Sequence, residues 1–343
     1  MPEVVKNTLY VSDPGYSLHQ DHETVRIKEG RETILQVPLH HLRAIALLSP
    51  SYLSPPLLAQ CLVRGISVSY MNGRGRFLAR LEGSRSGNVM LRRAQFRAAD
   101  DAAFKLLLGA RFIAGKILNT RLNLVRAARQ SASERPHDMT LKEAARSMGE
   151  IVPMLQHAAT MNELRGLEGQ AARSYFAAFN ACITKQKDSF SFDRRTRRPP
   201  RSRVNAVLSF IYALLTNDCV SACQAVGLDA FVGFLHESRS GRPSLALDLV
   251  EEFRGFGDRV ALALINRRQL QEESIIERPG GAYDLTDSAR KTLLATYQRK
   301  KALIISHPAL GIRCRIGELP IYQAQLLART IRGEGEYEPF LWK

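Results

Sequence analysis

The segment GFLHESRSGRPSLALDLVEEFR, residues 233–254, combines a histidine with acids at helical spacing. His236 ends an apolar run, and Asp248, Glu251 and Glu252 follow on an expected helix. Asp248 and Glu251 are three residues apart, so they are neighbours on one helix face and repel each other. A divalent cation would reverse that repulsion, because carboxylate oxygens suit Mg²⁺ and Mn²⁺ and an imidazole favours Mn²⁺. The stretch can therefore be half of a metal site.

A purely structural explanation of the same stretch is also open. Acids in the first turns of a helix interact favourably with the helix dipole, and Ser244, after Pro243, is the predicted N-cap. Glu251 could simply pair with Arg254. An apolar stripe would bury the helix against a core, and its members are Leu245, Leu249 and Phe253. The spacing alone does not choose between a core histidine and a metal ligand.

A further acid lies in LRGLEGQAARSYFAAF, residues 164–179. Helical spacing puts Glu168 at the border of a buried stripe, beside Gly169, which leaves room for close approach. Taken alone, Glu168 is more simply explained as half of a surface pair with Arg165 or Arg173, and such pairs contribute little stability.

Between these segments, TKQKDSFSFDRRTRRPPRSR (184–203) carries eight basic residues against two aspartates. Its length, its arginine bias and its position predict a loop that binds phosphates. The expected DNA contacts in this loop and in 233–254 are Arg194, Arg195, Arg197, Arg198, Arg239 and Arg242.

The overall charge also indicates a polyanionic partner. The 343 residues include 49 Lys and Arg against 33 Asp and Glu, a formal net charge of +16. Nucleic acid is the first expected partner and an anionic membrane surface the second. We find neither an apolar run of the roughly 18–20 residues that a spanning helix needs nor a signal peptide, which predicts a cytoplasmic protein. The five scattered cysteines argue against a disulfide framework, and Cys219 and Cys223 are expected in the core.

The elements that must position these residues predict an α+β protein with two domains. Short segments rich in Val, Ile, Tyr and Thr, separated by turns such as DPG and KEGRE, predict a small mostly-β domain over 1–85. That domain includes a short helix at PPLLAQCLVRG and a hairpin around Asn72-Gly73. SRSGN (84–88) is the predicted linker.

From Val89 onward, apolar residues recur three and four apart, which predicts an all-α catalytic domain over 86–343. A polar break, SASERPHD, separates a first helical region from a second that begins at Met139. Further helices are expected over 162–183, 203–226, 244–253, 258–270 and 286–303.

The sequence lacks the Walker loop, the GxGxxG turn after a strand, and the HExxH and GxSxG motifs. The three segments above, in their order, instead resemble the CRISPR-associated integrase family of spacer acquisition, the first-numbered member of the Cas series. The matching motifs are LEGQAARSYF around Glu168, RPPRSRVNAVLSFIYALL at 198–215 and GFLHESRSGRPSLALDLVEEFR at 233–254. A β-domain before a larger helical domain is similar too, and the motif wording most resembles the type I-C version.

The resemblance implies a divalent metal, Mn²⁺ or Mg²⁺, held by Glu168, His236 and Glu251, the last being the second acid of a DLxE-type motif. Asp248, the first acid of that motif, would assist nearby. Many relatives have Asp where this chain has Glu251, so the oxygen ligand here stands on a longer side chain.

The resemblance also implies a reaction and partners. A DNA 3′-hydroxyl attacks a phosphodiester of the CRISPR repeat and another 3′-oxygen leaves, with the metal polarising the phosphoryl oxygen. With water as nucleophile, the same site acts as an endonuclease. Asn205 and Tyr212 lie in the family's helix motif and would be structural or position DNA. Expected partners are double-stranded DNA (prespacer and repeat), a second copy bound through the β-domain, the small ferredoxin-like second member of the Cas series, and an end-trimming nuclease.

Two alternatives stay open from the sequence. A metal-independent recombinase would use a tyrosine nucleophile, with Tyr175 near Arg173 as the candidate, and would work in EDTA through a covalent adduct with DNA. A non-catalytic architectural DNA-binding protein would carry its acids as surface residues, so alanine at Glu168, His236 or Glu251 would change nothing.

Overall fold

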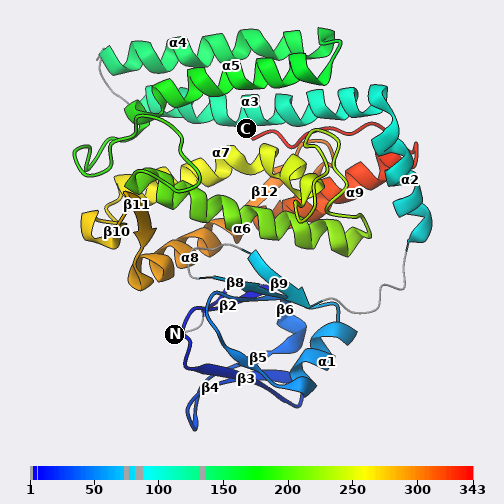
Figure 1. The fold of residues 1–343 in the computed structure, drawn as a ribbon, viewed down its shortest axis with the longest axis vertical. Coiled ribbons are helices and arrows are strands. Elements are labelled where there is room, and N and C mark those ends of the chain that lie inside the picture. The colour runs from blue at the N-terminus through cyan, green and yellow to red at the C-terminus, as the bar shows by residue number, and fades with distance from the viewer. Residues whose placement is uncertain (1–2, 6, 73–76, 82–87, 131–135, 343) are drawn as a thin grey trace. The chain divides into compact units, whose positions relative to one another are not determined.

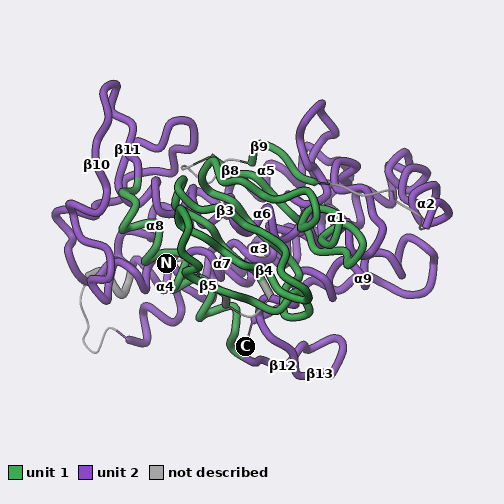
Figure 2. The backbone as a smooth tube through the Cα atoms, turned by 90° about the horizontal axis from the view of Figure 1, so that it is seen from below, with its two compact units in different colours: residues 1–87, 285–303 green, residues 88–284, 304–343 purple. Residues whose placement is uncertain are grey.

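The computed structural model describes residues 3–5, 7–72, 77–81, 88–130 and 136–342. The chain divides into two compact units, coloured separately in Figure 2: residues 1–87 with 285–303, and residues 88–284 with 304–343. Of the predicted linker at 84–88, only Asn88 is among the described residues, and the polar break at 131–138 is described only from Pro136 onward.

The first unit contains two β-sheets that share one core (Figure 1). One sheet has the strand order β1-β2-β6-β8-β9 and the other β5-β4-β3-β7. The strands are β1 (Glu3–Val5), β2 (Asn7–Val11), β3 (Tyr16–Asp21), β4 (Thr24–Glu29), β5 (Glu32–Pro38), β6 (Leu42–Leu47), β7 (Tyr52–Leu53), β8 (Ser67–Met71) and β9 (Phe77–Leu81). Alternate residues of β3 and β4 point inward. Leu9 of β2, Ile27 of β4 and Cys61 of helix α1 (Pro55–Val63) are fully buried in the shared core. The prediction of a β-rich N-terminal region is confirmed.

This unit also contains a pair of antiparallel strands and a helix from late in the sequence. Strands β8 and β9 pair antiparallel, as the predicted hairpin requires, while the turn at 73–76 lies outside the described residues. Helix α8 (Asp287–Lys301), which the sequence analysis places in the helical domain, belongs to this unit, and its Lys291 forms an ion pair of 3.1 Å with Asp13.

The second unit is built from long helices. These are α2 (Val89–Asp100), α3 (Ala102–Gln130), α4 (Pro136–Ile151), α5 (Met161–Phe179), α6 (Arg203–Val226), α7 (Ser244–Asn266) and α9 (Leu319–Ile331). Helix α7 lies between α3 and α6 (Figure 1), and it carries buried residues along its whole length. The part predicted as all-α also contains two hairpins, which correct that prediction: β10 (Ile275–Arg278) with β11 (Ala282–Leu285), and β12 (Ile304–His307) with β13 (Ile312–Arg315).

Helix α7 differs from its prediction in two respects. It runs unbroken to Asn266 instead of forming two helices, and its N-cap is Pro243, so Ser244 is its first residue. Gly255 lies inside the helix and does not end it, and a Cβ there would lie 2.6 Å from the carbonyl oxygen of Asn119 on α3. The glycine instead allows two helices to pack closely. The Ser244 hydroxyl donates to the carbonyl of Glu237 at 2.8 Å, which ties the preceding loop to the helix.

Helix α6 is long and apolar enough to cross a membrane by length and composition, which the sequence analysis did not recognise. However, 72% of an apolar 18-residue window of this helix is buried within the protein, as in the core helix of a folded domain. Cys219 and Cys223 on this helix are fully buried core residues, as predicted.

Candidate metal centre

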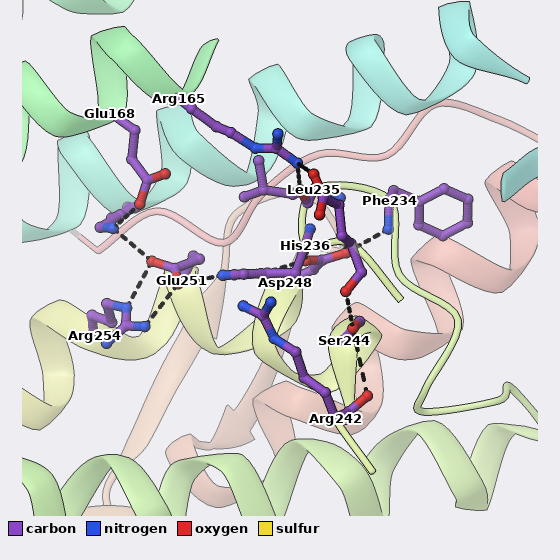
Figure 3. A network of polar contacts seen from close by, with 12 residues as sticks. Arg165, Glu168, Phe234, Leu235, His236, Arg242, Ser244, Asp248, Glu251 and Arg254 are labelled. Atoms are coloured by element: carbon purple, nitrogen blue, oxygen red, sulfur yellow. Dashed lines mark hydrogen bonds and ion pairs between the residues drawn. The ribbon is translucent and has the colours of Figure 1, made fainter. Parts of the chain in front are cut away.

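Asp248 organises the loop that carries His236 (Figure 3). This aspartate is fully buried on α7, and its carboxylate accepts hydrogen bonds from the backbone N–H groups of Phe234, Leu235 and His236 at 2.7, 3.1 and 2.9 Å. Its Oδ1 is also 2.7 Å from Nδ1 of the His236 ring. Because these contacts engage both carboxylate oxygens and one ring nitrogen, Nε2 is the nitrogen left to face the centre.

Glu251 lies one turn further along α7, and its side chain is only 1% exposed. Arg254 donates to both of its oxygens, at 2.7 and 2.8 Å, and Nζ of Lys116 is 2.9 Å from Oε2. Burial alone would raise the pKa of Glu251, but Arg254 and Lys116 hold that pKa well below its ordinary value. Nε2 of His236 is 3.8 Å from Oε1. Glu251 therefore forms the ion pair with Arg254 that its spacing predicted, and its ionised carboxylate also faces His236.

Glu168 approaches from α5, and its side chain is 24% exposed. Its Oε1 contacts Nζ of Lys116, so one ammonium group touches both Glu168 and Glu251. Arg165, one of the partners expected for Glu168, instead forms an ion pair of 3.1 Å with Glu237 in the His236 loop. Glu168 is therefore directed into the cluster.

Glu168, Glu251 and Nε2 of His236 thus converge from α5, α7 and the preceding loop (Figure 3). Among the residues that the structure describes, no three His, Cys, Asp or Glu side chains already stand close enough to hold a metal. The donor types nevertheless fit Mn²⁺ or Mg²⁺: two carboxylates, and an imidazole whose other nitrogen is engaged by Asp248. Lys116 lies between the two carboxylates, so a bound cation would require its ammonium to withdraw.

The two tyrosines named in the sequence analysis lie in the core. Tyr175 and Tyr212 donate hydrogen bonds to the two oxygens of Asp258 at 2.8 and 2.5 Å. Tyr175 is 3% exposed, and burial raises its pKa well above the ordinary value of a phenol. The guanidinium of Arg254 lies 4.8 Å from the centre of the Tyr212 ring. Tyr212 therefore supports the arginine that holds Glu251.

The basic segment is shaped by Arg195 and Asn205. The Arg195 guanidinium donates to Oδ1 of Asn205 at 2.8 Å, to the hydroxyl of Ser209 at 3.0 Å and to the carbonyl of Thr196. The Asn205 side chain also donates to the carbonyl of Arg194 at 2.9 Å. These two residues hold the loop against α6, so Arg195 has fewer donors left for DNA than its neighbours have.

The other predicted DNA contacts are more accessible. Exposed positions in the basic segment are Arg194, Arg197 and Arg198. The like charge of Arg254 lowers the pKa of Arg197, which indicates that Arg197 lies near the acidic cluster. Arg239 is 69% exposed, and the half-buried Arg242 extends from its loop towards the cluster in Figure 3.

Helix α2 carries a basic face that the sequence analysis did not single out. A hollow of about 540 Å³ is lined by Val89, Arg92, Arg93, Phe96, Arg97 and Asp229. The Phe96 side chain is 49% exposed. Fully buried Gln95 donates to the carbonyls of Asp229 and Val232 at 2.8 and 2.9 Å, which ties α2 to the loop leading to His236. The alternation of Arg and Phe in RRAQFR was the available signal.

The family model for CRISPR associated protein Cas1 matches residues 9–299. The chain belongs to the Cas1 family. A CRISPR-associated endonuclease Cas1 of Moorella thermoacetica is 43% identical over 342 residues, or 99% of each chain. A CRISPR-associated exonuclease Cas4/endonuclease Cas1 fusion of Geobacter sulfurreducens is 33% identical over 95% of this chain and 56% of the fusion.

Solved structures agree on the Cas1 fold. A casposase bound to an integration product has a TM-score of 0.81 at 22% identity, over 97% of this chain and 93% of the casposase. A Cas6-RT-Cas1–Cas2 complex has a TM-score of 0.79 at 21% identity, over 100% of this chain and 37% of that one. The Cas1 match includes the segments that carry Glu168, His236 and Glu251, and the resemblance inferred from their motifs is confirmed at the level of the family.

Proposed function

We propose that this Cas1-family chain is a divalent-metal-dependent DNA integrase and endonuclease that inserts new spacers into a CRISPR array. The observation that carries the proposal is the convergence of Glu168, Glu251 and Nε2 of His236, with Asp248 holding the imidazole. These three side chains are the proposed ligands of Mn²⁺ or Mg²⁺.

In the proposed reaction, a DNA 3′-hydroxyl attacks a repeat phosphodiester and another 3′-oxygen leaves, whereas water as nucleophile gives cleavage. When bound, the metal would polarise the phosphoryl oxygen and offset developing negative charge. Asp248 keeps the His236 ring in one orientation, and Arg254 keeps Glu251 ionised and in place. Arg197 and Arg242 supply positive charge near the cluster, where DNA phosphates would be positioned.

The two alternative functions have less support. A tyrosine nucleophile would have to reach DNA, but the Tyr175 hydroxyl is buried and donates to Asp258. An architectural role would place the acids on the protein surface. Glu251 is instead buried between Lys116 and Arg254, and burying such charges is costly, so an architectural role does not explain its position.

The first test is the metal requirement. Joining of a short 3′-hydroxyl duplex to a supercoiled plasmid carrying a CRISPR repeat, with the ferredoxin-like partner present, should require Mn²⁺ or Mg²⁺ and stop in EDTA. No protein–DNA adduct should survive denaturation, because the hydroxyl attacks the phosphodiester directly. Joining that persists in EDTA, or a stable adduct, would support the recombinase instead.

For DNA binding, we propose two surfaces: the basic segment, through Arg194 and Arg198, and the α2 face, through Arg93 and Arg97. Lysine and arginine contacts to phosphates supply affinity that weakens with salt. The half-exposed ring of Phe96 between the α2 arginines also suits stacking against an unpaired base.

Double variants that each remove two positive charges should show the contribution of each surface to DNA binding. Arg194→Gln with Arg198→Gln, and Arg93→Gln with Arg97→Gln, should each weaken DNA binding and reduce the slope of log affinity against log salt by about two. Fluorescence anisotropy across a salt series measures that slope. The control pair, Lys142→Gln with Arg146→Gln on α4, should keep the wild-type slope. A surface whose double variant also keeps it is not on the DNA path.

The partners proposed for this chain follow the family. We propose a homodimer formed through the β-rich domain at 1–85, with the helical remainder, 86–343, as the catalytic and DNA-binding domain. The complex that contains Cas1 and Cas2 supports an assembly with the small ferredoxin-like second member of the Cas series, and the Cas4/Cas1 fusion supports an end-trimming nuclease partner. The motif wording at 233–254 supports the type I-C version.

A further inference from the structure

A single lysine occupies the middle of the candidate metal centre. The Lys116 side chain, on α3, is 13% exposed. Its Nζ contacts Oε1 of Glu168 on α5 and lies 2.9 Å from Oε2 of Glu251 on α7. One ammonium group therefore joins the two carboxylates that are the proposed oxygen ligands, at the point where a divalent cation would have to touch both.

The packing of α3 explains why the lysine reaches this point. Gly115 precedes it, and a Cβ there would lie 2.8 Å from Pro339 and 3.1 Å from the Glu252 side chain. One turn later, Asn119 donates to the carbonyl of Glu252 at 2.9 Å. These contacts hold the backbone of α3 close to α7, whereas the four-carbon stem of Lys116 lets its ammonium move by rotamer changes alone.

Two cations already offset the charges of the two proposed carboxylate ligands without a metal. Glu168 and Glu251 carry two negative charges, and Lys116 and Arg254 carry two positive ones. A divalent cation added to this arrangement would place two more positive charges beside Lys116 and Arg254 in a largely buried place, which is unfavourable at a low effective dielectric constant. Arg254 is held by two hydrogen bonds to Glu251, so Lys116 is the cation that can leave.

We propose that Lys116 is a placeholder for the divalent cation: its ammonium holds Glu168 and Glu251 together in the metal-free protein and competes with the metal for them. The proposal rests on the function proposed above. It predicts that Glu168 and Glu251 stay together in the metal-free protein. It also predicts that the protein binds the divalent cation more weakly than the same ligands would without Lys116.

The test is the affinity for Mn²⁺ alone, measured from the electron paramagnetic resonance signal of free Mn²⁺ with the full-length chain and no DNA. Lys116→Met should bind at least about tenfold more tightly than wild type, because the competing charge is gone. Lys116→Arg should bind several-fold more weakly, because a guanidinium grips carboxylates with a planar fork. Lys105→Met, on the same helix, should match wild type.

A second readout concerns stability. Metal-free Lys116→Met should melt below wild type, since its two carboxylates then repel each other, and saturating Mn²⁺ should raise its melting temperature by more than that of wild type. Lys116→Gln replaces the Met variant if that variant does not fold. If wild type binds Mn²⁺ and the folded Lys116→Met or Lys116→Gln variant binds it equally or more weakly, the placeholder is overturned and the metal function stands. If neither wild type nor the folded variants bind Mn²⁺, both proposals fail.

Discussion

Replacing His236 by alanine should lower Mn²⁺-dependent strand joining by a factor on the order of 10³ or more. The imidazole is the nitrogen donor that faces Glu251, and Asp248 fixes its orientation through Nδ1. Alanine removes the donor but leaves three backbone N–H groups bonded to Asp248, so the loop should keep its fold. Single-turnover joining of a 3′-hydroxyl duplex to a repeat-bearing plasmid measures the loss.

A matched control is available in the same unit. His157 is exposed and its ring contacts Gln156, so His157→Ala should join DNA at the wild-type rate. Salt-dependent DNA binding should be unchanged in both variants, because neither loses an arginine. If folded His236→Ala joins DNA as fast as wild type, the proposed ligand set is wrong.

Replacing Glu251 by leucine should destabilise the protein by about 3–5 kcal/mol, the usual cost of removing one partner from a buried ion pair. The Arg254 side chain is 11% exposed and donates to both oxygens of Glu251, so the variant leaves a guanidinium without its counter-ion. Urea unfolding followed by circular dichroism measures the change. The variant should also lose any stabilisation by Mn²⁺.

A double variant shows whether the unpaired charge causes that loss. Glu251→Leu combined with Arg254→Met removes both charges and should recover part of the stability, giving a coupling free energy between the two positions. The exposed pair of Arg146 and Glu150 provides the control, since Glu150→Leu should change stability by less than about 0.5 kcal/mol. A folded Glu251→Leu protein as stable as wild type would contradict the described ion pairs.

Much of the helical unit could be predicted from local patterns, because caps and apolar periodicity are local. The predicted helix over 203–226 coincides with α6, which begins after the Ser202 cap and ends at Gly227. Helix α5 likewise begins after the cap Thr160, close to its prediction. The predicted break between the helices over 244–253 and 258–270 was wrong, because α7 continues through Gly255, which lies in close contact with α3.

For the candidate site, the residues could be predicted from the sequence but their contacts could not. Motif residues such as Glu168, His236 and Glu251 could be found from residue type and order, and the match to the Cas1 family covers them. Their actual partners could not be predicted. Helical spacing indicated Arg165 as a partner of Glu168, but it cannot indicate Lys116, which is 52 residues away and on another helix.

The sequence by itself therefore determined most of the helices, the β-rich N-terminal region, the excess of positive charge and the acids and histidine that could bind a metal. Only the tertiary structure decided that Asp248 is engaged by the His236 loop and that Lys116 lies between Glu168 and Glu251. The physical reason is that these contacts depend on how closely α3, α5 and α7 approach one another. Small residues such as Gly115 permit that approach, but no periodicity within a single helix encodes it.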